Sequence, residues 1–94
     1  MILLLLISCM GYSESQVRRG ELNCEWLDTC GELGTVGFEG VGDCKAAAAA
    51  QPYDDDQCPD YDATAMSGCL RAYEDAIAGE DCAAEFTDAC LVCG

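Results

Sequence analysis

Residues 62–78 read DATAMSGCLRAYEDAIA, and this stretch carries the strongest indication of fold in the chain. Its larger apolar side chains recur at i, i+3, i+4, i+7 and i+11, a spacing that places them on one face of a helix. They are Met66, Cys69, Leu70, Tyr73 and Ile77. Asp62 or Asp60 suits the N-terminal end, and Gly79 suits the left-handed position that often follows the last turn. We therefore expect a helix over residues 62–78 with one face in the core.

The segment that follows, residues 80–92, indicates a shorter helix with one apolar face. The residues on that face are Cys82, Phe86 and Cys90, and Cys93, directly after the segment, could extend it. A connection at Gly79 and Glu80 would fold the two helices into an antiparallel αα-hairpin. Cys69 lies ten residues before Gly79 and Cys90 lies ten after Glu80. At 1.5 Å per residue, both would lie at the same distance from the connection along the helix axes. Cys69–Cys90 is therefore the first-choice disulfide, with Cys82 as the main competitor.

A helix is also expected upstream, over residues 21–30, where the apolar residues again have roughly helical spacing. Gly31 ends it. Cys24 and Cys30 are six residues apart and lie on different faces of such a helix. They therefore cannot pair with each other, and each needs a distant partner.

Residues 31–42 are rich in glycine, which indicates a mobile loop. A short hairpin around Val36 and Phe38 would fit within this loop. The glycines recur every third residue over part of the segment, but one dozen residues without proline cannot form a collagen helix.

Residues 43–51 predict a further helix, because five consecutive alanines are the best intrinsic helix formers. Asp43 is a good N-cap candidate, and Pro52 ends the helix. The alanines offer little surface to bury, so Cys44 is expected to fasten this helix to the core.

Cysteine content sets the class of protein, with nine cysteines among 94 residues. This density is typical of a disulfide scaffold, which persists only in oxidising compartments. If Cys9 has a separate chemical fate, eight cysteines remain for four disulfides, each worth about 2–4 kcal/mol in a domain with a small core. The eight are Cys24, Cys30, Cys44, Cys58, Cys69, Cys82, Cys90 and Cys93. The chain is thus expected to be a mainly α, disulfide-stapled domain with a C-terminal αα-hairpin and a Gly-rich loop.

The N-terminus begins with an apolar run from Met1 to Ile7, followed by Ser8 and Cys9. Seven helical residues reach about 10 Å, far less than a hydrocarbon core of about 30 Å, so the run favours an export signal. The string Leu6-Ile7-Ser8-Cys9 resembles the lipobox of bacterial lipoproteins, with Leu three positions before the cysteine and a small residue directly before it. The resemblance covers nine residues and implies cleavage before Cys9, with acylation of its thiol and of the new amino terminus by chains such as palmitate.

This resemblance implies three parts: an export signal over residues 1–8, a lipidated cysteine with a flexible tether over 9–20, and a disulfide-rich helical domain over 21–94. In Gram-negative lipoproteins an Asp after the anchor cysteine favours the inner membrane, so Met10 implies the outer membrane. Secretion without an anchor is the alternative. The chain also resembles the small Cys- and Ala-rich lipoproteins of unknown role in bacterial envelopes.

The composition excludes several functions. The net charge is −14, which repels nucleic acid and anionic membrane surfaces but suits cations or a basic protein partner. The same charge favours a soluble monomer. There is no histidine, so histidine-based nucleophile pairs, general bases and zinc sites are absent from the sequence. We therefore expect no catalytic residues and no cofactor, and a membrane-anchored structural or interaction protein.

Two other functions remain open on sequence grounds. An acidic cation-binding protein, selective for calcium, would use Asp54, Asp56, Asp60 and Asp62. The spacing fails the EF-hand pattern, since Pro59 and Ala65 occupy the positions that need Gly and Glu, and a solvated turn is the competing interpretation. A thiol redox protein would use Cys90 and Cys93, although such pairs usually precede a helix.

Overall fold

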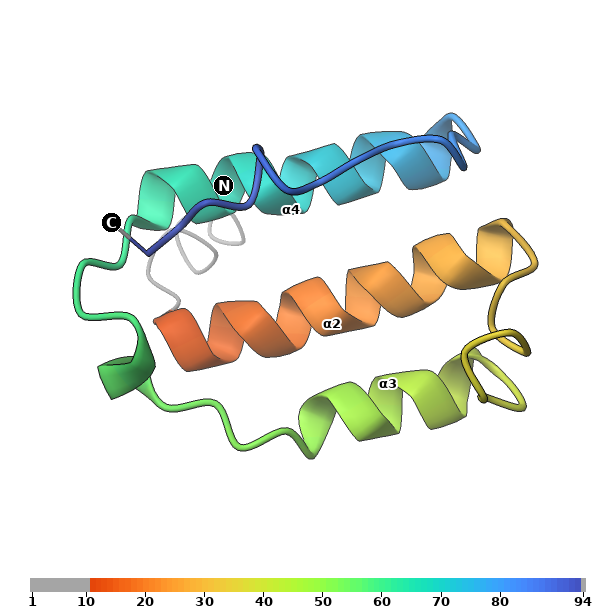
Figure 1. The fold of residues 1–94 in the computed structure, drawn as a ribbon, viewed down its shortest axis with the longest axis horizontal. Helices are drawn as coiled ribbons and strands as arrows, with labels where there is room; N and C mark the ends of the chain where they lie inside the picture. The colour runs from red at the N-terminus through yellow and green to blue at the C-terminus, as the bar shows by residue number, and fades with distance from the viewer. Residues whose placement is uncertain (1–10, 94) are drawn as a thin grey trace, which may run out of the picture.

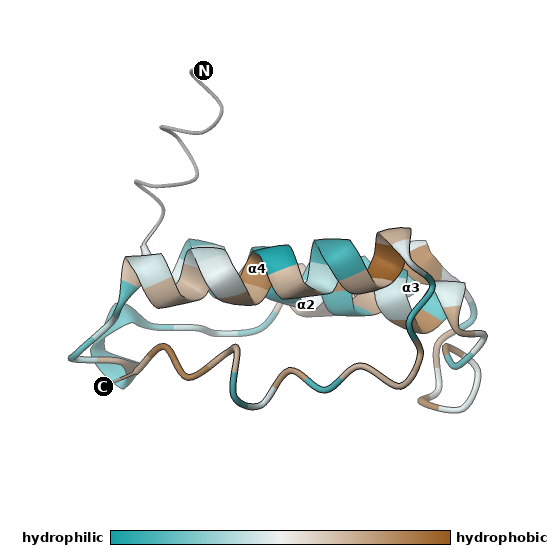
Figure 2. Cartoon of the chain, turned by 90° about the horizontal axis from the view of Figure 1, so that it is seen from above, coloured by the Kyte–Doolittle hydropathy of each residue, from teal (hydrophilic) through white to brown (hydrophobic). Residues whose placement is uncertain are grey.

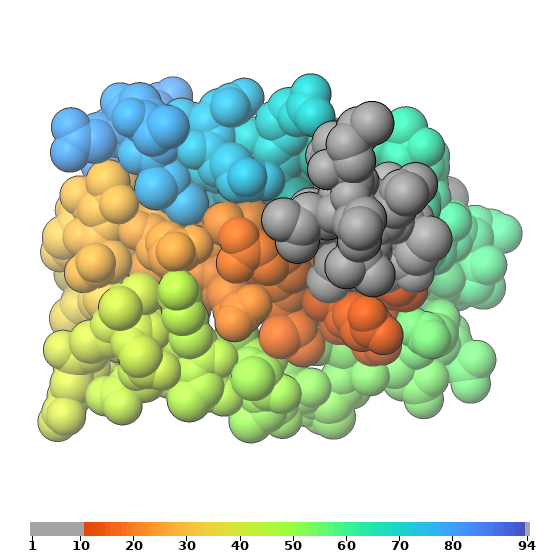
Figure 3. Space-filling view, turned by 180° about the vertical axis from the view of Figure 1, so that it is seen from behind, coloured from red at the N-terminus to blue at the C-terminus, as the bar shows by residue number. Residues whose placement is uncertain are grey.

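The structure is a computed structural model that describes residues 11–93 and folds them mainly into helices (Figure 1). The elements are α2 (Tyr12–Thr29), α3 (Val41–Ala49), the short 3-10 helix η1 (Asp55–Gln57) and α4 (Ala63–Ala78). Helix α2 lies between α4 and α3, as Figure 3 also shows from behind. Within these residues the only β pairing is an isolated antiparallel bridge between Tyr61 and Cys93. The prediction of a mainly α, disulfide-stapled domain is confirmed.

Two groups of buried side chains hold the helices together. The main core lies between α2, α4 and the C-terminal segment, and consists of Tyr12, Leu22, Cys58, Met66, Cys69, Leu70, Tyr73, Cys90 and Val92. The second cluster lies between α2, the Gly-rich loop and α3, and consists of Cys24, Leu33 and Cys44. Helix α2 contributes to both groups, so it is the element on which the rest of the fold packs.

Helix α2 begins much earlier than the sequence indicates. The predicted tether is wrong for residues 12–20, which form the first half of the helix. Apart from Tyr12, small and polar side chains make the contacts there: Ser15 is only 2% exposed and accepts a hydrogen bond of 3.1 Å from the Tyr61 hydroxyl. A Cβ added at Gly20 would lie 2.8 Å from the Ala48 Cβ, so this glycine lets α3 approach α2 closely.

Helix α3 and the loop before it are held by the second cluster. The helix begins after Gly40, which makes no side-chain cap, so the prediction of Asp43 as the N-cap is wrong. Cys44 fastens α3 to α2 through a disulfide to Cys24, as expected. The loop forms turns rather than a hairpin at residues 33–37, because Leu33 is buried against the second cluster.

Helix α4 has the predicted apolar stripe. Met66, Cys69, Leu70 and Tyr73 are buried, and Ile77 packs against the same core. Asp62 is the N-cap, because its Oδ1 accepts a hydrogen bond of 3.0 Å from the Ala65 amide. Both outcomes agree with the prediction from residues 62–78.

The C-terminal segment is not helical, so the predicted αα-hairpin is wrong. Residues 80–93 run back along α4 in turns and irregular backbone, on one side of the helix layer (Figures 1 and 2). One reason is that the Asp81 carbonyl accepts a 2.8 Å hydrogen bond from the Trp26 indole rather than a backbone bond within a helix. The Phe86 ring is held between other elements, stacked on Tyr73 and edge-on to Trp26. Side chains thus fix the path of this segment in place of helical backbone bonds.

The left-handed residue after α4 is Glu80, one position later than the predicted Gly79. Gly79 has φ −90°, whereas Glu80 has φ +52°. The Glu80 amide donates to the Ile77 carbonyl and the Asp81 amide donates to the Ala76 carbonyl, which is the Schellman pattern of helix termination. A residue with a Cβ therefore occupies the position that glycine fills at least cost.

We expect Glu80→Gly to raise the free energy of unfolding by about 0.5–1 kcal/mol, because glycine adopts this backbone conformation without steric strain. Guanidinium denaturation measures the effect. Glu80→Ala is the matched control, since it removes the same carboxylate but keeps the Cβ and gives no such gain. Equal stabilisation by both variants would assign the effect to charge and contradict the backbone explanation.

Candidate functional site

The cysteines of the described residues are all used in disulfides. The bridges are Cys24–Cys44, Cys30–Cys82, Cys58–Cys93 and Cys69–Cys90, with sulfur–sulfur distances from 1.95 to 2.11 Å. The predicted Cys69–Cys90 bridge is confirmed, although its second half is not helical, and Cys82 pairs with Cys30 instead. Cys9, the predicted lipidation site, lies outside the described residues.

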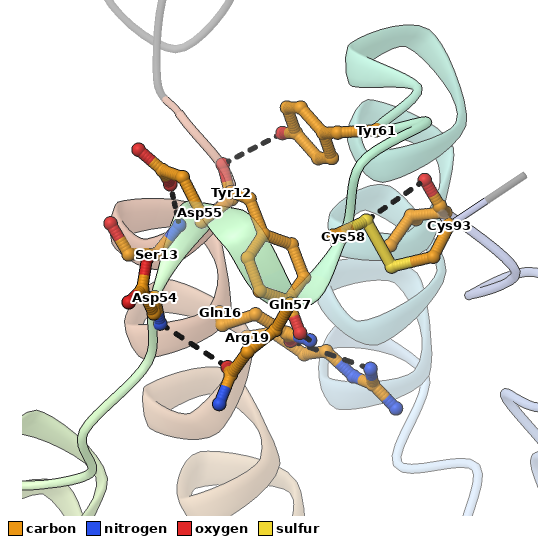
Figure 4. Close-up of a disulfide and its surroundings, with 12 residues drawn as sticks. Tyr12, Ser13, Gln16, Arg19, Asp54, Asp55, Gln57, Cys58, Tyr61 and Cys93 are labelled. Carbon is orange, nitrogen blue, oxygen red and sulfur yellow. Dashed lines mark hydrogen bonds between the residues drawn. A yellow bond between two sulfur atoms is a disulfide. The ribbon is translucent and has the colours of Figure 1, made fainter.

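The Cys90 and Cys93 pair does not form a disulfide of its own. Cys90 bonds to Cys69 of α4. Cys93 bonds to Cys58, which precedes α4 (Figure 4). Each sulfur is therefore paired with a different element. In this state neither thiol is free to attack a substrate disulfide, since the nucleophile in such exchange is a thiolate.

The acidic turn uses its carboxylates in local structure. Asp54 caps η1: its side chain accepts from the Asp56 amide at 3.0 Å, and its own amide donates to the Gln57 side chain at 3.2 Å. Asp55 Oδ1 accepts a 3.0 Å hydrogen bond from the Ser13 amide, which joins η1 to the start of α2 (Figure 4).

The four aspartates that the calcium hypothesis requires have separate roles in the structure. Asp54 and Asp62 each cap a helix, while Asp56 and Asp60 are exposed to solvent. Across residues 11–93, no three or more Cys, Asp or Glu side chains are arranged to hold a metal ion. The interpretation of this segment as a solvated turn whose last Asp caps the next helix agrees with the geometry.

A cavity that the sequence did not reveal lies beside α2, with a volume of about 320 Å³. Its lining residues are Gln16, Arg19, Gly20, Asn23, Tyr53 and Tyr73. The first four occupy positions i, i+3, i+4 and i+7 of one helix and therefore share a face of α2. Tyr53 comes from the connection between α3 and η1, and Tyr73 comes from α4. Three distant segments of the chain thus meet at this cavity.

Hydrogen bonds along α2 fix the orientation of two polar side chains of the cavity, Gln16 and Arg19. The Gln16 Nε2 donates to the Tyr12 hydroxyl at 3.0 Å, which orients the amide. The Gln16 Oε1 then accepts from the Arg19 Nη1 at 3.4 Å. Figure 4 shows the three side chains following one another along the helix. The guanidinium is therefore positioned by a neutral partner rather than by a carboxylate.

Arg19 is a half-buried cation without a carboxylate partner among the described residues, whereas Arg71, which also lacks one, is exposed. Two of the four cations form ion pairs, Arg18 with Glu21 at 3.9 Å and Lys45 with Glu25 at 3.3 Å. Among the described residues, no carboxylate oxygen lies within 4.0 Å of the Arg19 guanidinium. The cavity therefore presents a positive group to solvent in a chain whose net charge is −14.

The comparisons with known proteins add no relative to these observations. No family model, no curated protein and no solved structure matches the chain.

No helix within residues 11–93 combines the length and apolar character needed to span a bilayer.

Proposed function

We propose that the chain is an exported, lipid-anchored and non-enzymatic interaction protein of the bacterial cell envelope, in the outer membrane where the cell has one. The observation that carries the proposal is the pairing of cysteines. The eight cysteines of residues 11–93 satisfy one another in four disulfides, which leaves Cys9 without a cysteine partner in the chain. Cys9 follows the apolar run and the Leu6-Ile7-Ser8 sequence that resembles a lipobox.

The proposal of a binding role rests on the chemistry of the side chains. The chain has no histidine, and its eight described cysteines are in disulfides, so residues 11–93 offer neither a thiolate nucleophile nor an imidazole general base. The polar side chains gathered around the cavity are better suited to holding a ligand than to transferring a proton.

The early start of α2 limits how far an anchored domain extends from its lipid. Three Cα steps of 3.8 Å separate Cys9 from Tyr12, a reach of about 11 Å at most. The helical domain would therefore sit at the bilayer surface. The N-terminal end of α2, with the Asp55 contact to Ser13, would be the end nearest the headgroups.

We expect Cys9→Ser to move the protein from the membrane fraction to the soluble fraction and to abolish processing, because acyl anchoring requires the thiol. Intact mass spectrometry of protein purified from membranes measures cleavage, acylation and the number of disulfides together. A control variant, Ser8→Ala, keeps a small residue before the cysteine and retains the anchor. An unprocessed mass, or a processed chain without acyl groups, would contradict lipidation, and the second result would indicate ordinary secretion.

A further inference from the structure

We propose that the cavity beside α2 binds a small organic carboxylate, with Arg19 as the residue that recognises the carboxylate group. The site does not depend on lipidation or on the proposed location of the protein. It rests on the chemistry of the groups that meet there.

The first argument is the free coordination of the guanidinium. Arginine presents donors in a rigid fork that matches the two oxygens of a carboxylate, and it strongly prefers a charged acceptor. Arg18 has a charged acceptor in Glu21, and Arg71, which has none among the described residues, is exposed to solvent on α4. Arg19 instead has the neutral Gln16 Oε1 at 3.4 Å, which occupies only one of its donors. The remaining donors are open to a ligand.

The second argument is the hydroxyl of Tyr73, a largely buried residue, which has no protein partner among the described residues. Tyr73 is only 5% exposed and lines the cavity from α4, and its ring is fixed by stacking on Phe86 with centroids 3.8 Å apart. Its hydroxyl makes no hydrogen bond with any described residue, yet no fully buried side-chain polar atom of residues 11–93 is left unsatisfied. The hydroxyl must therefore be open to the cavity, where it can donate to a ligand oxygen.

The third argument is the size and polarity of the space. A volume of about 320 Å³ is at the lower end of ligand pockets, which span about 300–1,000 Å³. Two amides, two phenols and one guanidinium line it, so the fitting molecule is small and polar. The net charge of −14 repels polyanions, whereas one carboxylate is the charge that a single arginine neutralises. A monosaccharide acid has the required size, charge and hydroxyl groups.

The test is a titration of the ¹⁵N-labelled full-length protein with glucuronate, followed by the amide and side-chain resonances of the cavity residues. Glucose and inorganic phosphate are the comparison probes. We expect saturable shifts at Asn23 and Arg19 with glucuronate, and at least tenfold weaker binding of glucose. Equal binding of glucose, or binding of phosphate alone, would overturn recognition of a carboxylate. Absence of saturable shifts with every probe would overturn the site.

Variants separate the site from general electrostatics. Arg19→Gln is expected to weaken glucuronate binding at least tenfold, whereas Arg18→Gln, which removes the same charge from the next residue, changes it by less than twofold. Tyr73→Phe keeps the ring and removes the hydroxyl, and is expected to weaken binding several-fold. Equal losses in the two arginine variants would show diffuse attraction and overturn the proposal. Thermal melting of each variant confirms that the fold is retained before affinities are compared.

Discussion

Replacing Cys69 and Cys90 together by alanine is expected to lower the free energy of unfolding by about 2–5 kcal/mol. The bridge spans 21 residues, so its loss returns considerable freedom to the unfolded chain. Its sulfur atoms also lie in the main core, where Cys69 is 0% exposed. The irregular C-terminal segment has few backbone bonds to α4 and depends on such attachments for its position. Guanidinium denaturation, followed by circular dichroism, measures the loss.

The Cys24→Ala/Cys44→Ala variant is the matched control, since that bridge spans 20 residues and has nearly the same loop-closure entropy. It belongs to the second cluster and fastens only α3, whose alanines bury little surface. We expect α3 to lose protection from hydrogen exchange while α2 and α4 keep theirs. Loss of protection throughout the molecule in this variant, as in the Cys69/Cys90 variant, would contradict the division into two clusters.

Met66→Ala is expected to cost about 2–5 kcal/mol of unfolding free energy, the range for truncating a large buried aliphatic side chain. Met66 is the largest fully buried side chain of the described residues, with 1% exposure, and it packs between α4 and the rest of the main core. Truncation removes its contacts and leaves a cavity that rigid neighbours, among them the Cys69–Cys90 bridge, cannot fill. The midpoint of guanidinium denaturation gives the effect.

Two substitutions serve as controls for Met66→Ala. Met66→Leu keeps nearly the same volume and is expected to cost less than about 1.5 kcal/mol. Val36→Ala removes an apolar side chain that is 52% exposed in the Gly-rich loop, and is expected to change stability by less than about 0.5 kcal/mol. A small loss in Met66→Ala would mean that the main core rearranges to fill the gap, which would contradict the expectation that its neighbours cannot.

Helix α4 could be predicted from sequence because large apolar side chains at helical spacing coincide with a capping aspartate. The first half of α2 could not, because Tyr12 is its only large buried side chain and its other contacts are made at Ser15 and Gly20. A hydropathy pattern predicts that Ser15 and Gly20 are exposed to solvent. Their small size is what allows other elements to pack closely against them. The pattern of apolar residues therefore predicts an element only when large side chains do the packing.

The C-terminal helix illustrates the opposite error. Cys82, Phe86 and Cys90 have helical spacing, but each is held by a different partner: a disulfide to α2, an aromatic stack, and a disulfide to α4. Periodicity cannot distinguish a common face from separate attachments. The cavity was missed for a related reason, since Tyr53 and Tyr73 join Arg19 only through the tertiary fold.

The order of the disulfides has a consequence for biogenesis. None of the four bridges joins cysteines that are consecutive in the described sequence, and the Cys30–Cys82 bond interlaces with the other three. A chain that emerges N-terminus first into an oxidising space presents Cys24 and Cys30 before their true partners. Any early bond between those two must later be reopened by thiol–disulfide exchange. Where such a bond forms during export, a disulfide isomerase or a reshuffling thiol couple is needed to reach the native pairing.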